Sequence, residues 1–465
     1  MTGRHATTTC EERLETYIDE LASVIGHADR VRPLHDYCVG LMLPVERKSV
    51  EPMAAKTAPA RTSAQHQSLL HFVGKGQWSD ERLLAKVREL VLPGIERHGA
   101  IRAWILDDTS FPKQGRHSVG VARQYCGQLG KQDNCQTMVS LSLANDYASL
   151  PVAHRLYLPQ EWVDDAARRA KAGVPEDIGF KTKPQIALEL IRWACAAGLP
   201  RGVGLLDAGY GVDATLRMGL SDLGIAYVAG VLPSTLAWKP GTRPEPGEGA
   251  PKKGRRGHSD ILSLKEIALG LKARAWSTVE WREGTCDVLS SRFALVRVHV
   301  AHRHLTPERH VEEWLLIEWP SDEPEPTKYW LSTCPDDIAI DQLVDLAKLR
   351  WRIERDYQEL KQEVGLGHYE GRGWRGFHHH ITLSIAAYGF LISERETIPP
   401  SAPRRTVLRP PSDLPQDWRP RGSPAQARAP RADLDRHHAA ASHRRPHKAP
   451  APMPMLPRRE QTNSR

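Results

Sequence analysis

Three carboxylates and two cations have the types and spacing that phosphodiester chemistry needs. Asp108 and Asp207 each follow an apolar run, and Glu354 lies between Arg350 and Lys361 on one polar segment. Carboxylate oxygens are the ligands that Mg²⁺ prefers, and two such ions activate the attacking oxygen and stabilise the leaving oxygen of a phosphodiester. Arginine and lysine hold phosphate oxygens, the first as a planar fork and the second as a point charge. These five residues are therefore candidates for cutting a nucleic acid.

The segment that carries Glu354 predicts a helix from about Ile338 to a glycine cap at Gly365. At about 100° per residue, Arg350, Glu354 and Lys361 fall within roughly 40° of one another, beside an apolar stripe. Glu354 is thereby favoured over its acidic neighbours. The alternative is an ordinary core helix whose charges form i,i+4 ion pairs.

The aspartates sit in a segment with alternating strands and helices. Three strands, a helix, a strand, a helix and a strand are expected in that order, at 103–106, 136–143, 150–158, 184–197, 202–206, 213–223 and 225–232. Three antiparallel strands followed by parallel units are typical of the ribonuclease-H-like α/β fold, which has a mixed sheet. Strand alternation also means that only one of Asp107 and Asp108 can face the groove.

Five regions are expected along the chain. They are a helical N-terminal region at 1–100 that is suited to DNA binding, the first part of the catalytic core at 101–232, a β-rich insertion at 233–335, the last helices of the core at 336–398 and a tail at 399–465. The insertion holds a basic run, Lys252–Arg256, for which solvated surface is the alternative to phosphate contact. The tail is rich in proline and arginine without apolar periodicity, which predicts disorder.

Charge and cysteine content narrow the possible classes. The net charge is +8, but residues 401–465 carry 14 Lys and Arg against 5 Asp and Glu, so the body is close to neutral. Any DNA contact there must come from local clusters. The seven cysteines form no CxxC pair, which indicates reduced thiols. No signal peptide and no long apolar run is found, so a cytoplasmic, nucleoid-associated protein without a membrane segment is expected.

Several motifs are absent or misleading. No serine-hydrolase elbow and no nucleotide-binding P-loop occurs, which argues against both classes. The G-x-G-x-x-G at 371–376 follows a helix and has no strand before it, so it does not predict a dinucleotide site. The triplet His378–His380 is expected on the surface or facing DNA.

The arrangement around Glu354 resembles a known family. Arg350, Glu354 and Lys361 match the R-x3-E-x6-K part of the tyrosine–arginine–glutamate–lysine signature of bacterial insertion-sequence DDE transposases. Asp108-Thr-Ser resembles their first-aspartate strand, and Leu206-Asp-Ala-Gly-Tyr resembles the second. The segments 120–125, 134–136 and 371–378 are also similar to one branch of this group. The resemblance covers roughly residues 65–395.

This resemblance implies cut-and-paste transposition of an insertion sequence by metal-dependent strand cleavage and strand transfer. It implies Asp108, Asp207 and Glu354 as catalytic and metal-binding residues, with two Mg²⁺ ions and Mn²⁺ as a substitute. It implies double-stranded DNA, as terminal inverted repeats and as target, and a homodimer in the synaptic complex. The residues expected to contact DNA are Arg350, Lys361, Trp351, Trp330, Arg123, Lys131 and Tyr357.

One position departs from the family signature, because its tyrosine falls at Ala347. Tyr357 is expected to supply the missing phosphate contact. Both tryptophans suit stacking on an unpaired base, with the protein core as the alternative. Two other functions stay open, namely a structure-selective DNA nuclease with the same fold and an inactive DNA-binding relative. Specific binding to inverted repeats, and cutting that depends on Mg²⁺, distinguish the three.

Overall fold

The computed structural model describes residues 9–242, 260–283, 288–301 and 312–397. Two of the expectations lie outside the described residues, namely the basic run Lys252–Arg256 and the tail at 399–465. Within the described part, no helix has the length and apolar character needed to cross a membrane.

Five helices form the N-terminal region, as the sequence predicts. They are α1 (Cys10–Ala22), α2 (Val31–Met42), α3 (Val50–Thr57), α4 (Thr62–Lys75) and α5 (Asp80–Arg97). Ser79 caps α5, because its side chain accepts a hydrogen bond from the Arg82 amide. Pro52 lies in the first turn of α3 and Pro59 lies before α4, where proline costs a helix no hydrogen bond.

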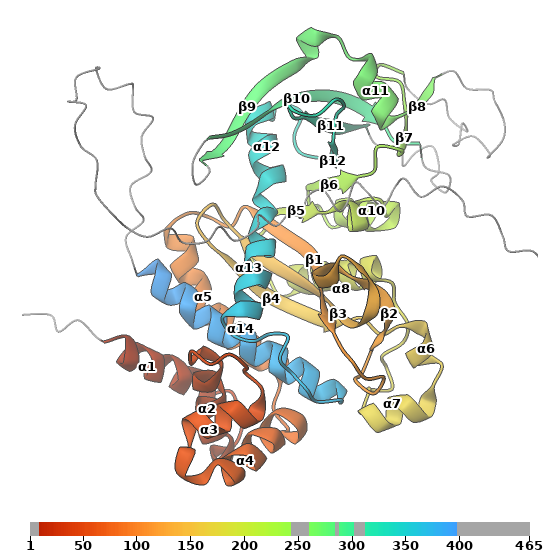
Figure 1. The fold of residues 1–465 in the computed structure, drawn as a ribbon. Helices are drawn as coiled ribbons and strands as arrows, with labels where there is room; N and C mark the ends of the chain where they lie inside the picture. The colour runs from red at the N-terminus through yellow and green to blue at the C-terminus, as the bar shows by residue number, and fades with distance from the viewer. Residues whose placement is uncertain (1–8, 243–259, 284–287, 302–311, 398–465) are drawn as a thin grey trace, which may run out of the picture. The chain divides into compact units, whose positions relative to one another are not determined.

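A mixed sheet forms the centre of the fold (Figure 1). Its core strands are β1 (Ala103–Pro112), β3 (Lys131–Ala144), β4 (Ser149–Leu156), β5 (Val203–Leu206) and β6 (Tyr227–Val231). The order across the sheet is β4-β3-β1-β5-β6, with β3 antiparallel to its neighbours and β5 parallel to both β1 and β6. The ribonuclease-H-like mixed sheet is thereby confirmed. A short strand, β2 (Ala122–Cys126), forms a hairpin with the start of β3.

Helices connect the core strands. They are α6 (Gln160–Val163), α7 (Ala166–Ala172), α8 (Lys183–Ala196), α9 (Ala208–Gly211) and α10 (Ala214–Asp222). A capping box formed by Thr182 and Gln185 begins α8, with Pro184 in its first turn.

The strands of the insertion continue the same sheet from β6. They are β9 (Trp276–Glu283), β10 (Val288–His299), β11 (Glu312–Trp319) and β12 (Lys328–Ser332), all antiparallel, with β12 paired to β6. The short pair β7 (Leu236–Trp238) and β8 (Ile261–Ser263) lies nearby and leads into α11 (Leu264–Gly270). The sequence did not predict β9, whose side chains alternate less clearly.

The helix expected around Glu354 is interrupted at Arg350. It forms α12 (Ile340–Leu349) and α13 (Trp351–Gln362), and the Ile353 amide bonds the Arg350 carbonyl, a 3₁₀-type turn. Figure 1 shows the two in line, and contacts place α12 against β9 and α13 against β1 and β4.

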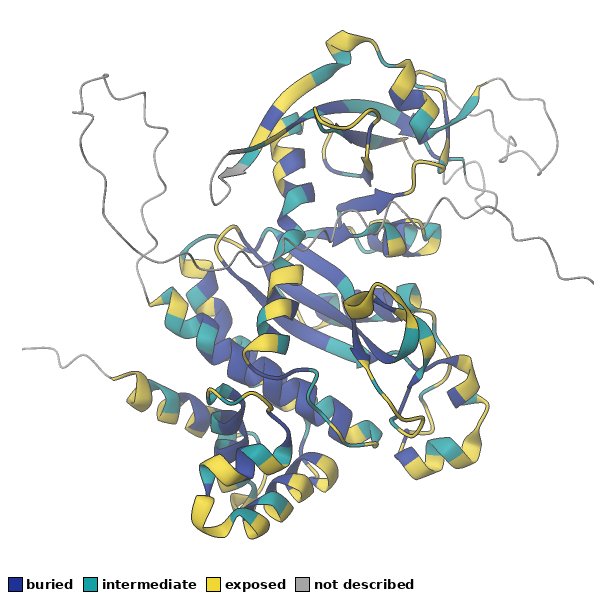
Figure 2. Cartoon of the chain, in the orientation of Figure 1, coloured by how far each residue is buried: buried dark blue, intermediate teal, exposed yellow. Residues whose placement is uncertain are grey.

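The last helix, α14 (Trp374–Glu396), is buried along most of its length, as Figure 2 shows. It packs on α2, α4, α5 and β4 and so joins the N-terminal helices to the catalytic sheet. The histidine triplet lies on it, and the expected surface position is wrong for His379 and His380, whereas His378 is half-buried. His379 and His380 are fully buried, and their ring nitrogens contact the carbonyls of Val73 and Gly365. The all-round apolar character of α14 carries these residues inside.

Candidate active site

The two aspartate-bearing strands lie side by side. Leu106 of β1 pairs with Leu206 of β5 in a parallel register, so Asp107 and Asp207 are the next residues on neighbouring strands. At that point β5 stops. The Asp207 carboxylate caps α9 by accepting the Tyr210 amide at 3.0 Å, while β1 continues alongside β3. These neighbouring strands therefore bring two acidic residues from distant parts of the sequence to one edge.

Asp107 faces helix α13. It pairs in register with Ser140 of β3, whose hydroxyl lies 2.7 Å from the Tyr357 hydroxyl of α13. The Tyr357 hydroxyl in turn donates a hydrogen bond to the Asp107 backbone carbonyl at 3.2 Å. The Asp107 carboxylate accepts a hydrogen bond from Nη1 of Arg350 at 3.0 Å.

Asp108 points to the other side of the sheet, as alternation requires. Its carboxylate is 2.7 Å from Nζ of Lys183, at the start of α8, and 3.3 Å from the Tyr210 hydroxyl. The structure thus brings Asp107, and not Asp108, to the side of the sheet that carries Glu354.

Arg350 connects the first strand to the glutamate. One of its terminal nitrogens contacts Asp107 and the other contacts Glu354, four residues along the chain. Burial acts to lower the pKa of Arg350, but Asp107, Glu354 and Asp207 together raise it. The Glu354 side chain is 61% exposed, so this carboxylate is free to move from the arginine to another cation.

The Asp107 carboxyl is electrostatically unusual. Burial raises its pKa; Arg350 opposes that effect, and the neighbouring charges of Asp207 and Asp108 add to it. Burial and the neighbouring carboxylates therefore disfavour the charged form of Asp107, although the guanidinium stabilises it. A further positive charge placed here would be stabilised.

Lys361 lies two turns beyond Glu354 on α13. Its ammonium donates to the Ser110 carbonyl at 3.2 Å, and burial lowers its pKa. It lines a cavity of about 240 Å³, together with Phe111, Pro112, Gln128, Gly367 and His368. The signature lysine therefore stands beside an open recess near the carboxylates.

The other residues expected to contact DNA differ in how far they are exposed to solvent. Trp330 on β12 is nearly buried, and Trp351 is half-buried with the Arg352 guanidinium 5.3 Å from its ring centre. Tyr357 is buried against β1 and β3, so its hydroxyl serves the protein interior. Arg123 and Lys131 are exposed on the β2–β3 hairpin, where Lys131 also pairs with Asp133 at 3.1 Å.

Sequence reasoning missed one cation near the site, Lys183, which is bonded to Asp108. Lys183 follows the capping residue of a predicted helix, which is a signal for its position on that helix but not for its partner. Pairing across the sheet is visible only in three dimensions.

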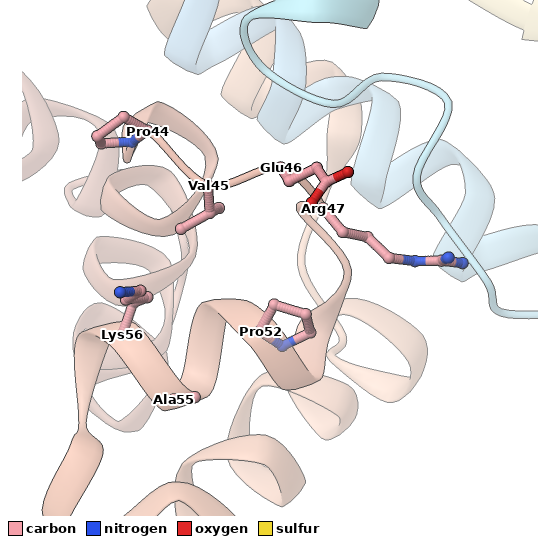
Figure 3. A pocket seen from close by; sticks show the side chains of 7 residues that line it. All are labelled: Pro44, Val45, Glu46, Arg47, Pro52, Ala55 and Lys56. Atoms are coloured by element: carbon pink, nitrogen blue, oxygen red, sulfur yellow. The ribbon is translucent and has the colours of Figure 1, made fainter.

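A second cavity, of about 620 Å³, lies in the N-terminal region (Figure 3). It is lined by Pro44, Val45, Glu46, Arg47, Pro52, Ala55 and Lys56. Figure 3 shows the Arg47 side chain extending away from the N-terminal helices. It pairs with Glu370, which lies between α13 and α14. None of the candidate carboxylates, cations or aromatic residues lines this cavity, so it is separate from the candidate active site.

Comparison with known proteins agrees with this geometry. A family model described as DDE superfamily endonuclease matches residues 20–287, and one described as Transposase DDE domain matches residues 189–390. A relative from Microchaete diplosiphon, named "Probable transposase for insertion sequence element IS701", is 29% identical over 194 residues, which is 42% of this chain and 47% of the relative. The match spans about half the length of that relative.

The first family model covers more than half of the chain and includes both Asp107, within β1, and Asp207, at the end of β5. On that extent of similarity, the chain belongs to the DDE superfamily of endonucleases.

Proposed function

We propose that this protein is a transposase that cuts an insertion sequence out of DNA and joins it to a new site. The observation that supports this most is the bridge made by Arg350, which ties Asp107 on β1 to Glu354 on α13 beside the end of β5. A core helix with simple i,i+4 pairs has no reason to reach a buried strand aspartate. The similarity to a transposase for an insertion sequence supports the same reading.

We propose Asp107, Asp207 and Glu354 as the catalytic carboxylates. Asp107 takes the place given to Asp108 by resemblance, because only Asp107 faces α13. Oxygen donors of this kind suit a hard divalent cation such as Mg²⁺. Among the described residues, no three His, Cys, Asp or Glu side chains gather closely enough to hold a metal. Glu354 would therefore join the aspartates by leaving Arg350.

Two Mg²⁺ ions at these carboxylates would supply activation of the attacking oxygen and stabilisation of the leaving oxygen. Arg350, once released by Glu354, is placed to hold a phosphate oxygen as a planar fork. Lys361 is placed to neutralise a phosphate further along the same strand. The substrates are then duplex DNA carrying the terminal inverted repeats and the target DNA, and two ends are held by a homodimer.

A cleavage assay tests this function. The purified chain is given a plasmid that carries the inverted repeats flanking its own reading frame, with and without Mg²⁺. Wild type is expected to nick at the repeat ends only with Mg²⁺. Asp207→Asn and Glu354→Gln should lower the cleavage rate at least 1,000-fold, as roughly 4 kcal/mol of lost transition-state stabilisation.

The matched control is Glu363→Gln, a carboxylate beyond the end of α13 that contacts neither Arg350 nor the strand aspartates in the described structure. It should cut like wild type. Cutting of any branched DNA without preference for the repeats would instead indicate a structure-selective nuclease. Repeat binding by wild type with no Mg²⁺-dependent cutting would indicate an inactive relative.

A further inference from the structure

The recess beside Lys361 is lined by side chains that donate hydrogen bonds. Its polar side chains are those of Gln128, Lys361 and His368, and none of the described residues that line it is acidic. The Lys361 ammonium donates to the Ser110 carbonyl, which leaves its other N–H bonds available. A wall of amide, ammonium and imidazole groups suits an anion that has several acceptor oxygens.

His368 is held in this wall by backbone contacts. Its Nδ1 accepts a hydrogen bond from the Lys48 amide at 3.0 Å, and its own amide donates to the Gly365 carbonyl at 2.8 Å. Because Nδ1 acts as an acceptor, the neutral ring carries its proton on Nε2. Within the described part of the chain, Nε2 bonds to no other residue, so this N–H is available to a ligand in the recess.

Gly365 allows the N-terminal region to approach His368 this closely. The glycine has a φ of 67°, in the left-handed region. A Cβ at this position would lie 2.7 Å from the Lys48 Cβ and 3.0 Å from the His368 Nδ1. The imidazole is therefore oriented by the segment between α2 and α3, whereas Lys361 comes from α13. Two distant parts of the chain supply donors to one recess.

The charges around His368 keep its ring neutral and favour an anion. Burial lowers the pKa of His368, and three neighbouring cations lower it further. These cations are Arg47, Lys48 and Lys113, and the opposing charge is that of Glu370, which pairs with Arg47. A neutral imidazole still donates a hydrogen bond, and the surrounding cations attract a phosphate.

The size and position of the recess fit one phosphate of a DNA strand. Its volume is about 240 Å³, below the ~300–1,000 Å³ of pockets for whole small molecules. Lys361 lies seven residues after Glu354 on α13, which is about 10.5 Å along a helix axis. Since each strand of duplex DNA advances about 3.4 Å per nucleotide, the recess lies about three nucleotides from a cut at Glu354.

From these contacts we propose that His368 binds DNA, with its Nε2–H donating to the phosphate that Lys361 neutralises, about three nucleotides from the cut. The Lys48 amide sets the tautomer of the ring, so the N-terminal region positions a donor for the cleaved strand. The inference rests on the proposed function, which supplies DNA as the substrate and Lys361 as a phosphate contact. His368 lies outside the motif around Glu354 and adds a neutral donor of fixed orientation.

The test uses a synthetic duplex that carries the terminal inverted repeat, in which single phosphates near the cut are replaced by uncharged methylphosphonates. Binding of the full chain is measured by fluorescence anisotropy without Mg²⁺, so that the duplex stays intact. In wild type, one replacement about three nucleotides from the cut should weaken binding at least tenfold.

His368→Asn removes the proposed donor and keeps the contact that orients it. The asparagine oxygen takes the place of Nδ1 and still accepts from the Lys48 amide, but no atom takes the place of Nε2. This variant should bind the unmodified duplex about tenfold more weakly, and methylphosphonate at the contact position should then cost much less than in wild type. His368→Gln, whose amide reaches the place of Nε2, should bind within about threefold of wild type.

The matched control is His27→Asn, because the His27 Nδ1 also accepts a backbone amide, that of Asp29 at 3.2 Å, and His27 does not line the recess. It should bind every duplex like wild type. Salt dependence separates the neutral donor from the cation. Lys361→Met should lower the slope of log affinity against log salt by about 0.9, whereas His368→Asn should leave the slope unchanged.

Equal losses on methylphosphonate replacement in wild type and in folded His368→Asn would overturn the proposal, and so would a lowered salt slope for that variant. Circular dichroism shows whether each variant is folded. If His368→Asn does not fold, weak binding by folded His368→Gln, or a wild-type scan without a sensitive phosphate near the cut, overturns the proposal. Failure of the proposed function looks different, because the chain then neither prefers the repeat duplex nor cuts it with Mg²⁺.

Discussion

At the scale of single residues, the choice between two adjacent aspartates decides the chemistry. Asp107 and Asp108 differ by one position in a strand, yet one contacts Arg350 and the other contacts Lys183. Successive side chains on a strand face opposite sides, so no small movement exchanges the two. In the proposed mechanism the acid that faces α13 shares a cation with Glu354, whereas the other acid contacts Lys183 of α8 and Tyr210 of α9.

Two single variants separate these roles. Asp107→Asn should lower Mg²⁺-dependent cleavage at least 1,000-fold and leave the fold intact, since an amide still accepts from Arg350. Asp108→Asn should retain cleavage within about tenfold of wild type, because it alters only a contact behind the strand. Cleavage rate and thermal melting are measured on the same preparations. The reverse pattern, with Asp108→Asn inactive and Asp107→Asn active, would restore the assignment made by resemblance.

At the scale of elements, helix α12 is fixed to the insertion strands by a buried ion pair. The Lys348 ammonium lies 2.7 Å from both oxygens of Glu318 on β11 and 4.2 Å from the centre of the Trp281 ring. Phe293 and Trp330 complete the cage, each 5.5 Å away. Lys348 stands two residues before Arg350. This contact therefore lies close to the break between α12 and α13, and Trp330 packs beside the lysine.

Removing the lysine should be costly. Lys348→Met leaves the buried Glu318 carboxylate without its cation, which typically costs about 3–5 kcal/mol of unfolding free energy. Urea denaturation measures the loss, and the double variant Lys348→Met with Glu318→Met should recover most of it. The exposed pair Lys265–Glu325 is the control, since Lys265→Met should cost less than about 1 kcal/mol. Equal losses for the two lysine variants would contradict the buried-pair account.

At the scale of the whole molecule, α14 links the N-terminal helices to the catalytic sheet through buried histidines. His380 lies 2.9 Å from the Tyr37 hydroxyl of α2, and the His379 ring stacks on Trp78 at 3.6 Å between centres. Burial lowers the pKa of each of these histidines to about 4. The neutral forms therefore stabilise the fold, and this contribution depends on pH.

The direction of this pH dependence follows from proton linkage. In the unfolded chain a histidine titrates near ~6.5, so the stabilisation by neutral His380 is complete above that pH and is lost as the pH falls towards 4. Between pH 7 and pH 5, His380 should account for about 2 kcal/mol of lost unfolding free energy. His380→Asn should be less stable than wild type at pH 7 but lose about 2 kcal/mol less on acidification. Parallel pH profiles in urea denaturation would show that His380 does not make this contribution.

Much of the architecture follows from patterns within the chain. The order of strands and helices predicted the ribonuclease-H-like sheet, and strands are found at 136–143 and over most of 150–158, where alternation placed them. These features depend on local periodicity, which a sequence records directly. Proline gives less guidance, because Pro52 and Pro59 lie where helical segments begin and do not separate them.

By itself the sequence determined that acidic residues follow two apolar strand segments, that Glu354 lies with Arg350 and Lys361 on one helical edge, and that a β-rich segment interrupts the core. Only the tertiary structure decided that Asp107 faces Glu354, that Tyr357, His379 and His380 are interior, and that the β2–β3 hairpin shares a recess with Lys361. The reason is physical. A local pattern fixes which way a side chain points relative to its neighbours in the chain, whereas its partner depends on which element packs against that face.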